Sequence, residues 1–145
     1  MDSDIEEIKK KLFKDKSTIS VSGHSEVIIT LILKVITIKI RRDKPSSFPI
    51  YINTNWLNNN HPSEYPLTTL TRNVYELELS SLIDRKEEII LIVDGSGFLS
   101  EKLIYLFLKE LAYLNKHDAI QLIFSNLETT LKSYQTLDYT RFFVE

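Results

Sequence analysis

The sequence has no cysteine among its 145 residues, and it has only three glycines and four prolines. The lack of cysteine excludes disulfide bonds, thiolate metal sites and cysteine nucleophiles, and it fits a reducing intracellular compartment. Because glycine and proline are scarce, we expect the connections between elements to be short or built from Asn, Ser and Asp. The net charge of −2 gives no overall basic character, so any contact with nucleic acid must come from a local patch.

Targeting and membrane-spanning signals are lacking too. The N-terminal stretch MDSDIEEIKKK is acidic and then basic, without the apolar centre of a signal peptide. The most hydrophobic run, Val27 to Ile40, is interrupted by two threonines and two lysines and is short for a bilayer span. We therefore expect a soluble protein that is neither secreted nor inserted in a membrane.

The chain length suits a single domain of residues 1–145, with an N-terminal helix and basic linker in 1–16 and the core in 17–145. The segment Trp56–Thr71 is expected to be an extended loop. Hydrophobic patterning predicts strands at Ser17–Ser22, Phe48–Thr54, Asn73–Leu79, Glu88–Asp94, Ala119–Phe124 and Tyr139–Val144, and helices at Ser3–Lys11, Ser80–Arg85 and Glu101–Asn115. Such a succession predicts an α/β domain with a mainly parallel central sheet.

The run EVIITLILKVITIKIRR, residues 26–42, is ambiguous. Its β-branched residues favour a strand, and Val35 to Arg41 alternates as a strand does. The run is nevertheless long for one strand, and it is apolar on every side, as a helix buried in a layered fold would be. Periodicity alone leaves both interpretations open.

Polar residues follow four of the predicted strands, and ligands of parallel sheets bind beyond the carboxyl ends of the strands. The four positions are Gly23-His24-Ser25, Asn53-Thr54-Asn55, Asp94-Gly95-Ser96 and Ser125-Asn126. Because these ends lie at one edge of a parallel sheet, the pattern predicts a single site there.

In this order the segments resemble the RecA-type recombinase ATPase core. The apolar strand that ends in Asp94 resembles a Walker B strand, Tyr51–Asn55 resembles the Ile-Asp-Thr-Glu type motif in shape, and Ile123–Leu127 echoes the Thr-Asn-Gln type motif. The resemblance spans roughly Ser17 to Val144 and rests on order and spacing. It implies one RecA-like P-loop-type core with helices flanking the sheet, and a helix for residues 27–40.

The phosphate chemistry of that family is incomplete in this sequence. His24 stands at the position of the P-loop lysine, and neutral imidazole supplies no fixed positive charge. Thr18 stands where the first glycine of the loop would be, and Asn55 stands at the position that resembles the water-activating glutamate. The resemblance therefore implies a vestigial nucleotide site without hydrolysis, made of Gly23, His24, Ser25, Asn55 and Asp94.

Two other interpretations of this site stay open. His24 can be an ordinary turn residue, and Asp94-Gly95 can be a strand-to-helix turn with no ligand. Ser25 and Asp94 also keep the chemistry to hold Mg²⁺ with a nucleotide, so weak binding of ATP and magnesium is compatible with the sequence. No cofactor is expected otherwise, and no metal site, because the three histidines do not cluster in the sequence.

The resemblance implies a non-catalytic scaffold subunit, similar to the small subunits of Shu-type complexes. Such a subunit would act in a nuclear homologous-recombination mediator complex that promotes assembly of the recombinase filament. Its partner would be another RecA-like or mediator subunit, with the recombinase and DNA contacted through the complex. The alternatives are a RecA-like subunit of the Elongator tRNA-modification complex and a small NTPase with an atypical P-loop.

Two groups of residues are candidates for contacts with partners. The aromatic and apolar group is expected to dock a protein, although Trp56 can equally fold back onto the domain. The basic group is expected to contact DNA phosphates without sequence preference. The N-terminal lysines are expected to form a solvated face, and a phosphate contact through them stays the alternative. The docking candidates are Trp56, Tyr65, Leu67, Phe142, Phe143 and Val144, and the phosphate candidates are Arg41, Arg42 and Lys44.

Overall fold

The computed structural model describes residues 2–15, 18–58, 64–95, 101–114, 120–126 and 139–144. Within these ranges the helices are α1 (Asp2–Lys14), α2 (Glu26–Asp43), α3 (Thr54–Asn58), α4 (Pro66–Tyr75), α5 (Leu79–Asp84) and α6 (Glu101–Leu114). The strands are β1 (Ile19–Gly23), β2 (Ser47–Asn53), β3 (Glu88–Asp94), β4 (Ile120–Ser125) and β5 (Thr140–Val144).

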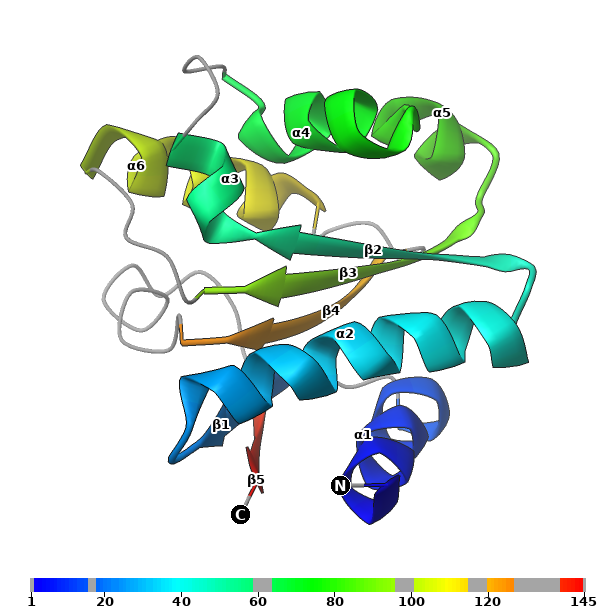
Figure 1. Cartoon of the computed structure of the whole chain (residues 1–145). Coiled ribbons are helices and arrows are strands. Elements are labelled where there is room, and N and C mark those ends of the chain that lie inside the picture. Colours follow the sequence, from blue (N-terminus) through cyan, green and yellow to red (C-terminus); the bar gives the residue numbers. More distant parts are fainter. Residues whose placement is uncertain are drawn as a thin grey trace.

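The five strands form one sheet in the order β2-β3-β4-β1-β5, and every pairing is parallel. Parallel neighbours need crossover connections, which here are largely helical. Figure 1 shows α1 and α2 on one face of the sheet and α3 to α6 on the other. The predicted fold class, an α/β domain with a parallel central sheet flanked by helices, is confirmed.

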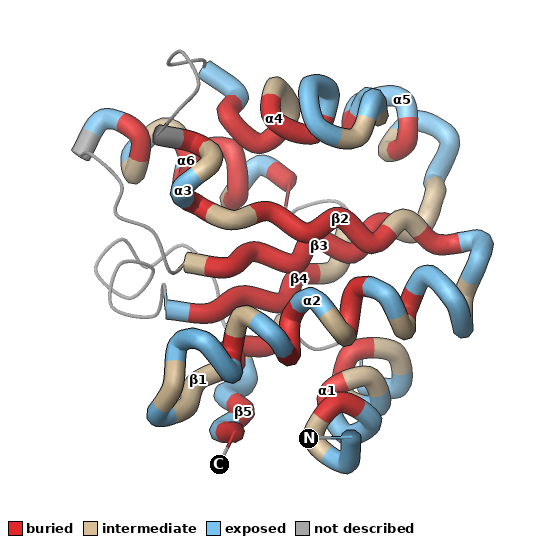
Figure 2. The backbone as a smooth tube through the Cα atoms, in the orientation of Figure 1, coloured by how far each residue is buried: buried red, intermediate tan, exposed pale blue. Residues whose placement is uncertain are grey.

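Each face of the sheet has its own hydrophobic core. On β3, Ile90 and Ile92 pack in the cluster under α1 and α2, whereas Ile89, Leu91 and Val93 pack in the cluster under α3 to α6. Since both faces are covered, β3 is apolar at successive positions, which explains its continuous hydrophobic run. Figure 2 shows the central strands as the most continuously buried part of the chain.

The ambiguous run forms helix α2, as the family resemblance implied. The side chain of Ser25 caps the helix by accepting a hydrogen bond from the backbone N–H of Ile28 at 3.3 Å. Packing against the sheet outweighs the β propensity of its residues. One face of α2 is buried in the core, through Ile29, Ile32, Leu33, Ile36, Thr37 and Ile40.

The predicted strand at Asn73–Leu79 is wrong. Its first three residues end α4, and Leu79 begins α5. The turn between them places Glu76 in the left-handed region, with a φ of 56°. The guanidinium of Arg72 pairs with both carboxylate oxygens of Glu78 across this turn. The alternation in the sequence thus arose from two helix ends and a turn.

The predicted loop at Trp56–Thr71 is also wrong for most of its described residues, although Glu64 and Tyr65 lie outside the helices. Residues up to Asn58 belong to α3, and α4 begins at Pro66, where proline is favoured because a first-turn N–H has no partner within the helix. The buried face of α4 includes Leu67 and Leu70. The helix is stabilised because these two side chains pack into the core cluster on this face of the sheet.

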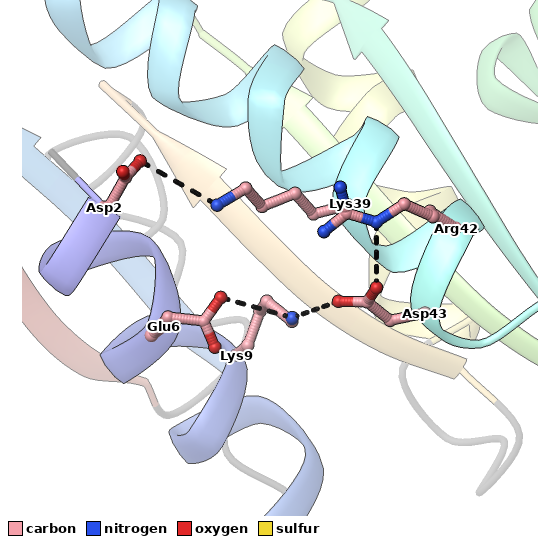
Figure 3. Close-up of polar contacts among 6 residues, drawn as sticks. All are labelled: Asp2, Glu6, Lys9, Lys39, Arg42 and Asp43. Atoms are coloured by element: carbon pink, nitrogen blue, oxygen red, sulfur yellow. Dashed lines mark hydrogen bonds and ion pairs between the residues drawn. The ribbon is translucent and has the colours of Figure 1, made fainter.

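Helix α1 packs its Ile5, Ile8 and Leu12 into the core shared with α2. Figure 3 shows the polar contacts that join the two helices. Lys9 Nζ lies 2.6 Å from Asp43 Oδ2 and 3.5 Å from Glu6 Oε1. This arrangement ties the N-terminal helix to the C-terminal end of α2.

Candidate functional site

The carboxyl ends of the strands lie at one edge of the sheet, as the sequence predicted. Asp94 at the end of β3 is in register with Asn53 of β2 and Ser125 of β4, and Gly23 of β1 is in register with Val144 of β5. Helix α2 follows β1 on one face and α6 follows β3 on the other. The ends of β1, β4 and β3 therefore lie at the edge of the sheet where ligands of parallel sheets generally bind.

Asp94 is fully buried, and its carboxylate is bonded by three hydroxyl groups. Thr30 Oγ1 donates to Oδ2 at 2.6 Å, and the Tyr51 hydroxyl donates to the same oxygen at 2.8 Å. Ser125 Oγ donates to Oδ1 at 3.3 Å. Asp94 lies on the same face of β3 as Ile90 and Ile92, so its side chain points under α2.

The Tyr51 hydroxyl is held in its protonated form. Burial raises the pKa of this phenol far above its usual value, and the hydrogen bond to Asp94 raises the pKa further. The phenol therefore remains a hydrogen-bond donor to the carboxylate at physiological pH. The ring also packs edge to face against Trp56, with 5.7 Å between centroids.

The connection between β1 and α2 consists of His24 and Ser25 alone. In a phosphate-binding loop, backbone N–H groups curl around the phosphates before the helix begins. Here β1 continues to Gly23, so the stretch that would form such a loop is a paired strand. The hollow at this turn has a volume of about 50 Å³, against about 300–1,000 Å³ for ordinary ligand pockets, and is lined by Gly23, His24, Ser25, Ile28, Ile29 and Val144.

Packing explains the glycine and the histidine of this turn. A Cβ on Gly23 would lie 2.7 Å from the carbonyl oxygen of Val144, so only glycine allows β5 to approach so closely. The His24 ring packs edge to face on Phe143, with centroids 5.0 Å apart. Gly23 therefore permits the close pairing of β1 with β5, and His24 adds a ring contact between the turn and β5.

Two other predicted site residues, Ser25 and Asn55, have hydrogen bonds of their own. The Ser25 hydroxyl is occupied by the helix cap described above. Asn55 is exposed at the start of α3, and its backbone N–H donates to Asn53 Oδ1 at 2.8 Å. The structure thus brings Asp94 together with Ser125, whereas the Ser25 hydroxyl accepts a hydrogen bond within α2.

Thr30 and Tyr51 were not predicted from the sequence as partners of Asp94. Thr30 was visible as a polar interruption of the apolar run, one turn inside α2. Tyr51 lies two residues before Asn53, and alternation along β2 places both on the same face. These signals become meaningful only once α2 is known to lie over that face.

The docking candidates differ in exposure. Leu67, Phe142 and Val144 are buried, which leaves these three without the exposed surface that docking needs. Tyr65 and Phe143 are exposed. Trp56 is half-buried and packs against both core clusters, in line with the interpretation that it folds back onto the domain.

The phosphate candidates all contact groups within the chain. Arg41 Nη2 lies 3.4 Å from the carbonyl oxygen of Pro49, and Arg42 pairs with Asp43. Lys44 Nζ lies 3.8 Å from the centroid of the Phe13 ring and 3.4 Å from Glu88 Oε1. Within the described residues, no three His, Asp or Glu side chains gather in a way that could hold a metal ion.

A larger cavity, of about 390 Å³, opens between α4, α5 and α6. Beside it the buried carboxylate of Glu110 accepts hydrogen bonds from the backbone N–H groups of Leu67 and Thr68, at 2.5 and 3.1 Å, and from the Thr68 hydroxyl. Burial raises the pKa of Glu110. The carboxylate thus caps the first turn of α4 from a neighbouring helix.

Comparison with known proteins agrees with this architecture at the level of the fold. No protein-family model and no curated protein sequence matches the chain. A structure of Drosophila ORC bound to poly(dA/dT) DNA and Cdc6 is similar with a TM-score of 0.66 and 10% identity, over 97% of this chain and 28% of that chain. A structure of C. elegans PCH-2 is similar with a TM-score of 0.54 and 14% identity, over 98% of this chain and 38% of that chain.

The chain therefore has an α/β fold similar to that of these two structures, with a five-stranded parallel sheet flanked by helices. The chain spans well under half the length of the two similar chains. Among the described helices, none combines the length and the apolar character needed to cross a membrane.

Proposed function

We propose that this chain is a non-catalytic scaffold subunit with a degenerate nucleotide site. The observation that carries the proposal is the state of Asp94, the residue at the Walker B position. Its carboxylate is fully buried and bonded by Thr30, Tyr51 and Ser125, while the turn before α2 is two residues long. A magnesium–nucleotide complex would have to displace these hydroxyls and open the turn.

The finer part of the proposal is a role in a homologous-recombination mediator complex, in the nucleus. It is supported by the order of Gly23, Tyr51–Asn55, Asp94 and Ser125-Asn126, which resembles the recombinase core. Loss of phosphate chemistry on such a core is typical of subunits that hold partners rather than turn over ATP. The chain would then form a hetero-oligomer with another RecA-like or mediator subunit.

Isothermal titration of the purified chain with ATP and Mg²⁺ tests the scaffold assignment. We expect no binding in the micromolar range, for the wild type and for Asp94→Ala alike. Micromolar binding that Asp94→Ala abolishes would overturn the proposal and favour a small NTPase.

Affinity purification from the native cell, followed by mass spectrometry, tests the recombination role. Enrichment of recombination factors is the expected result. Enrichment of tRNA-modification subunits in their place would contradict it.

A further inference from the structure

The face of α2 that points away from the sheet is apolar although it is exposed. Val27 and Ile38 are 79% and 64% accessible there, and Ile28 and Leu31 are exposed beside them. The opposite face supplies core residues, so α2 is hydrophobic on both sides while the described elements cover only one (Figure 2). A helix that is hydrophobic all round is normally buried, and an exposed apolar patch of this kind marks a contact surface.

The outward residues of α2 repeat with the spacing of a helix–helix contact. Val27, Leu31, Lys34, Ile38 and Arg41 follow one another at intervals of four, three, four and three, and all five are exposed. We call this stripe the α2 seam. An average spacing of 3.5 residues keeps one line of side chains facing a second helix, whereas an extended peptide or a flat surface would require no such repeat.

The charge of the α2 seam restricts what can cover it. Its polar members, Lys34 and Arg41, are both cations. Lys34 Nζ lies 5.7 Å from the centroid of the Tyr51 ring, and Arg41 bonds a backbone carbonyl, so neither of these contacts is with a carboxylate. A partner helix must therefore bring carboxylates to these positions.

A second copy of the chain fits the seam poorly. In an antiparallel pair of α2 helices centred on the seam, Lys34 of one copy would face Lys34 of the other. Like charges placed opposite one another are destabilising. An acidic helix from a different protein avoids this repulsion and makes use of the same apolar residues.

We propose that the α2 seam binds an amphipathic helix of a partner protein, with apolar residues at heptad spacing and carboxylates opposite Lys34 and Arg41. The inference rests on the proposed function in that it names the surface through which a scaffold subunit would hold its partner. It assigns a role to the apolar side of α2, which the described elements do not cover.

The test uses the full chain and a synthetic probe. The probe is a fluorescein-labelled peptide of about three heptads, with Leu at the two core positions and Glu at the flanking positions, and its twin carries Lys in place of Glu. Fluorescence anisotropy should show saturable binding of the acidic peptide and at least about tenfold weaker binding of the twin. Leu31→Asp and Val27→Asp should each abolish binding, because each places a carboxylate on the apolar seam opposite the acidic peptide. Both side chains are exposed, so the fold should tolerate the change.

The matched control is Val74→Asp on α4, which changes an apolar residue about as exposed as Leu31 and should leave binding unchanged. Circular dichroism confirms that each variant is folded. The proposal is overturned by no binding of the acidic peptide, by equal binding of the twin, or by equal loss in Val74→Asp.

Two further measurements can reassign the seam and so overturn the proposal. Leu31-dependent self-association in sedimentation velocity would assign it to a second copy, and Leu31-dependent binding to phosphatidylserine vesicles would assign it to a membrane surface. The outcome is independent of nucleotide. If the chain binds ATP and Asp94→Ala abolishes that binding, the scaffold proposal is wrong, but the peptide result for the α2 seam still holds. If the chain binds neither the acidic peptide nor ATP, only the proposal for the α2 seam is wrong.

Discussion

Asp94 lies under α2 and accepts hydrogen bonds from three hydroxyl groups, two of them on one oxygen. These hydrogen bonds join the end of β3 to α2, β2 and β4, so we expect the Asp94 side chain to stabilise the fold. This structural role can be measured, because a side chain that holds the fold together stabilises it, whereas a group kept for a ligand often does not.

Replacing Asp94 by alanine is expected to lower the free energy of unfolding by about 1–3 kcal/mol, because the hydroxyls of Thr30, Tyr51 and Ser125 lose their acceptor inside the protein. Urea denaturation followed by circular dichroism measures the change. The control is Asp84→Ala, an exposed carboxylate on α5, with little expected effect. Unchanged or increased stability of Asp94→Ala would contradict the structural role.

Gly23→Ala is expected to destabilise the protein by about 1–3 kcal/mol, because the added methyl group would overlap the Val144 carbonyl, which belongs to a paired strand and cannot easily move. Thermal denaturation and the amide exchange of β5 report the effect. Ser22→Ala, one residue earlier, should be close to neutral. Wild-type stability of Gly23→Ala would show that β5 can shift, and would remove the packing explanation for this glycine.

At the scale of elements, the attachment of α1 to α2 combines apolar packing with the ion pairs of Figure 3. The hydrogen bond to Lys9 holds the pKa of Asp43 below its usual range, and Arg42 acts in the same direction. The hydrogen bond to Asp43 raises the pKa of Lys9. Lys9 is consequently engaged in holding the N-terminal helix, whereas Arg42 contacts Asp43 within α2.

The attachment of α1 should weaken in acid. A carboxyl whose pKa is lowered by folding stabilises the fold above its ordinary value of 3.8, and this contribution is lost as the pH falls through the lower pKa of the folded state. The raised pKa of Lys9 matters only above its ordinary value of 10.5, where its contribution is lost as the pH rises. Exchange of the α1 amides, measured between neutral pH and pH 3, should therefore accelerate in acid beyond the intrinsic rate.

Asp43→Asn removes the titrating group and should flatten this dependence. Asp84→Asn should leave the wild-type curve unchanged. An acid dependence that persists in Asp43→Asn would assign it to another carboxyl group.

For the whole molecule, the sheet order predicts where stability is concentrated. Strand β3 is paired on both sides and has helices over both faces, whereas α1 packs on one side only. Native-state hydrogen exchange should show the amides of β3, from Ile89 to Val93, opening only with global unfolding, and the amides of α1 opening at lower free energy. Equal protection of the two elements would contradict this order.

The edge of the sheet formed by β2 has backbone groups that bond side chains of the same chain. On β2, Pro49 has no N–H, its carbonyl accepts from Arg41, and the Tyr51 carbonyl accepts from the Tyr75 hydroxyl. Such features block the pairing of an edge strand with other chains. A partner is therefore more readily received on α2 than along β2.

The sequence by itself determined the class of fold, because buried parallel strands require continuous apolar runs and these stand out at Glu88–Asp94 and Ala119–Phe124. It also placed the polar strand ends at one edge of the sheet, since that follows from parallel pairing. It failed at Asn73–Leu79, because a short alternation does not distinguish a strand from two helix ends joined by a turn. The identity of residues 26–42 as a helix came from the family resemblance.

Only the tertiary structure decided what Asp94 and Gly23 do. Their surroundings come from residues far apart in the chain: Thr30 and Tyr51 for the carboxylate, and Val144 for the glycine. No local pattern encodes these contacts, because they depend on how α2 lies across the sheet. The same placement buries one side of α2 and leaves Val27, Leu31 and Ile38 at the surface, which a hydrophobic run of this composition alone would not predict.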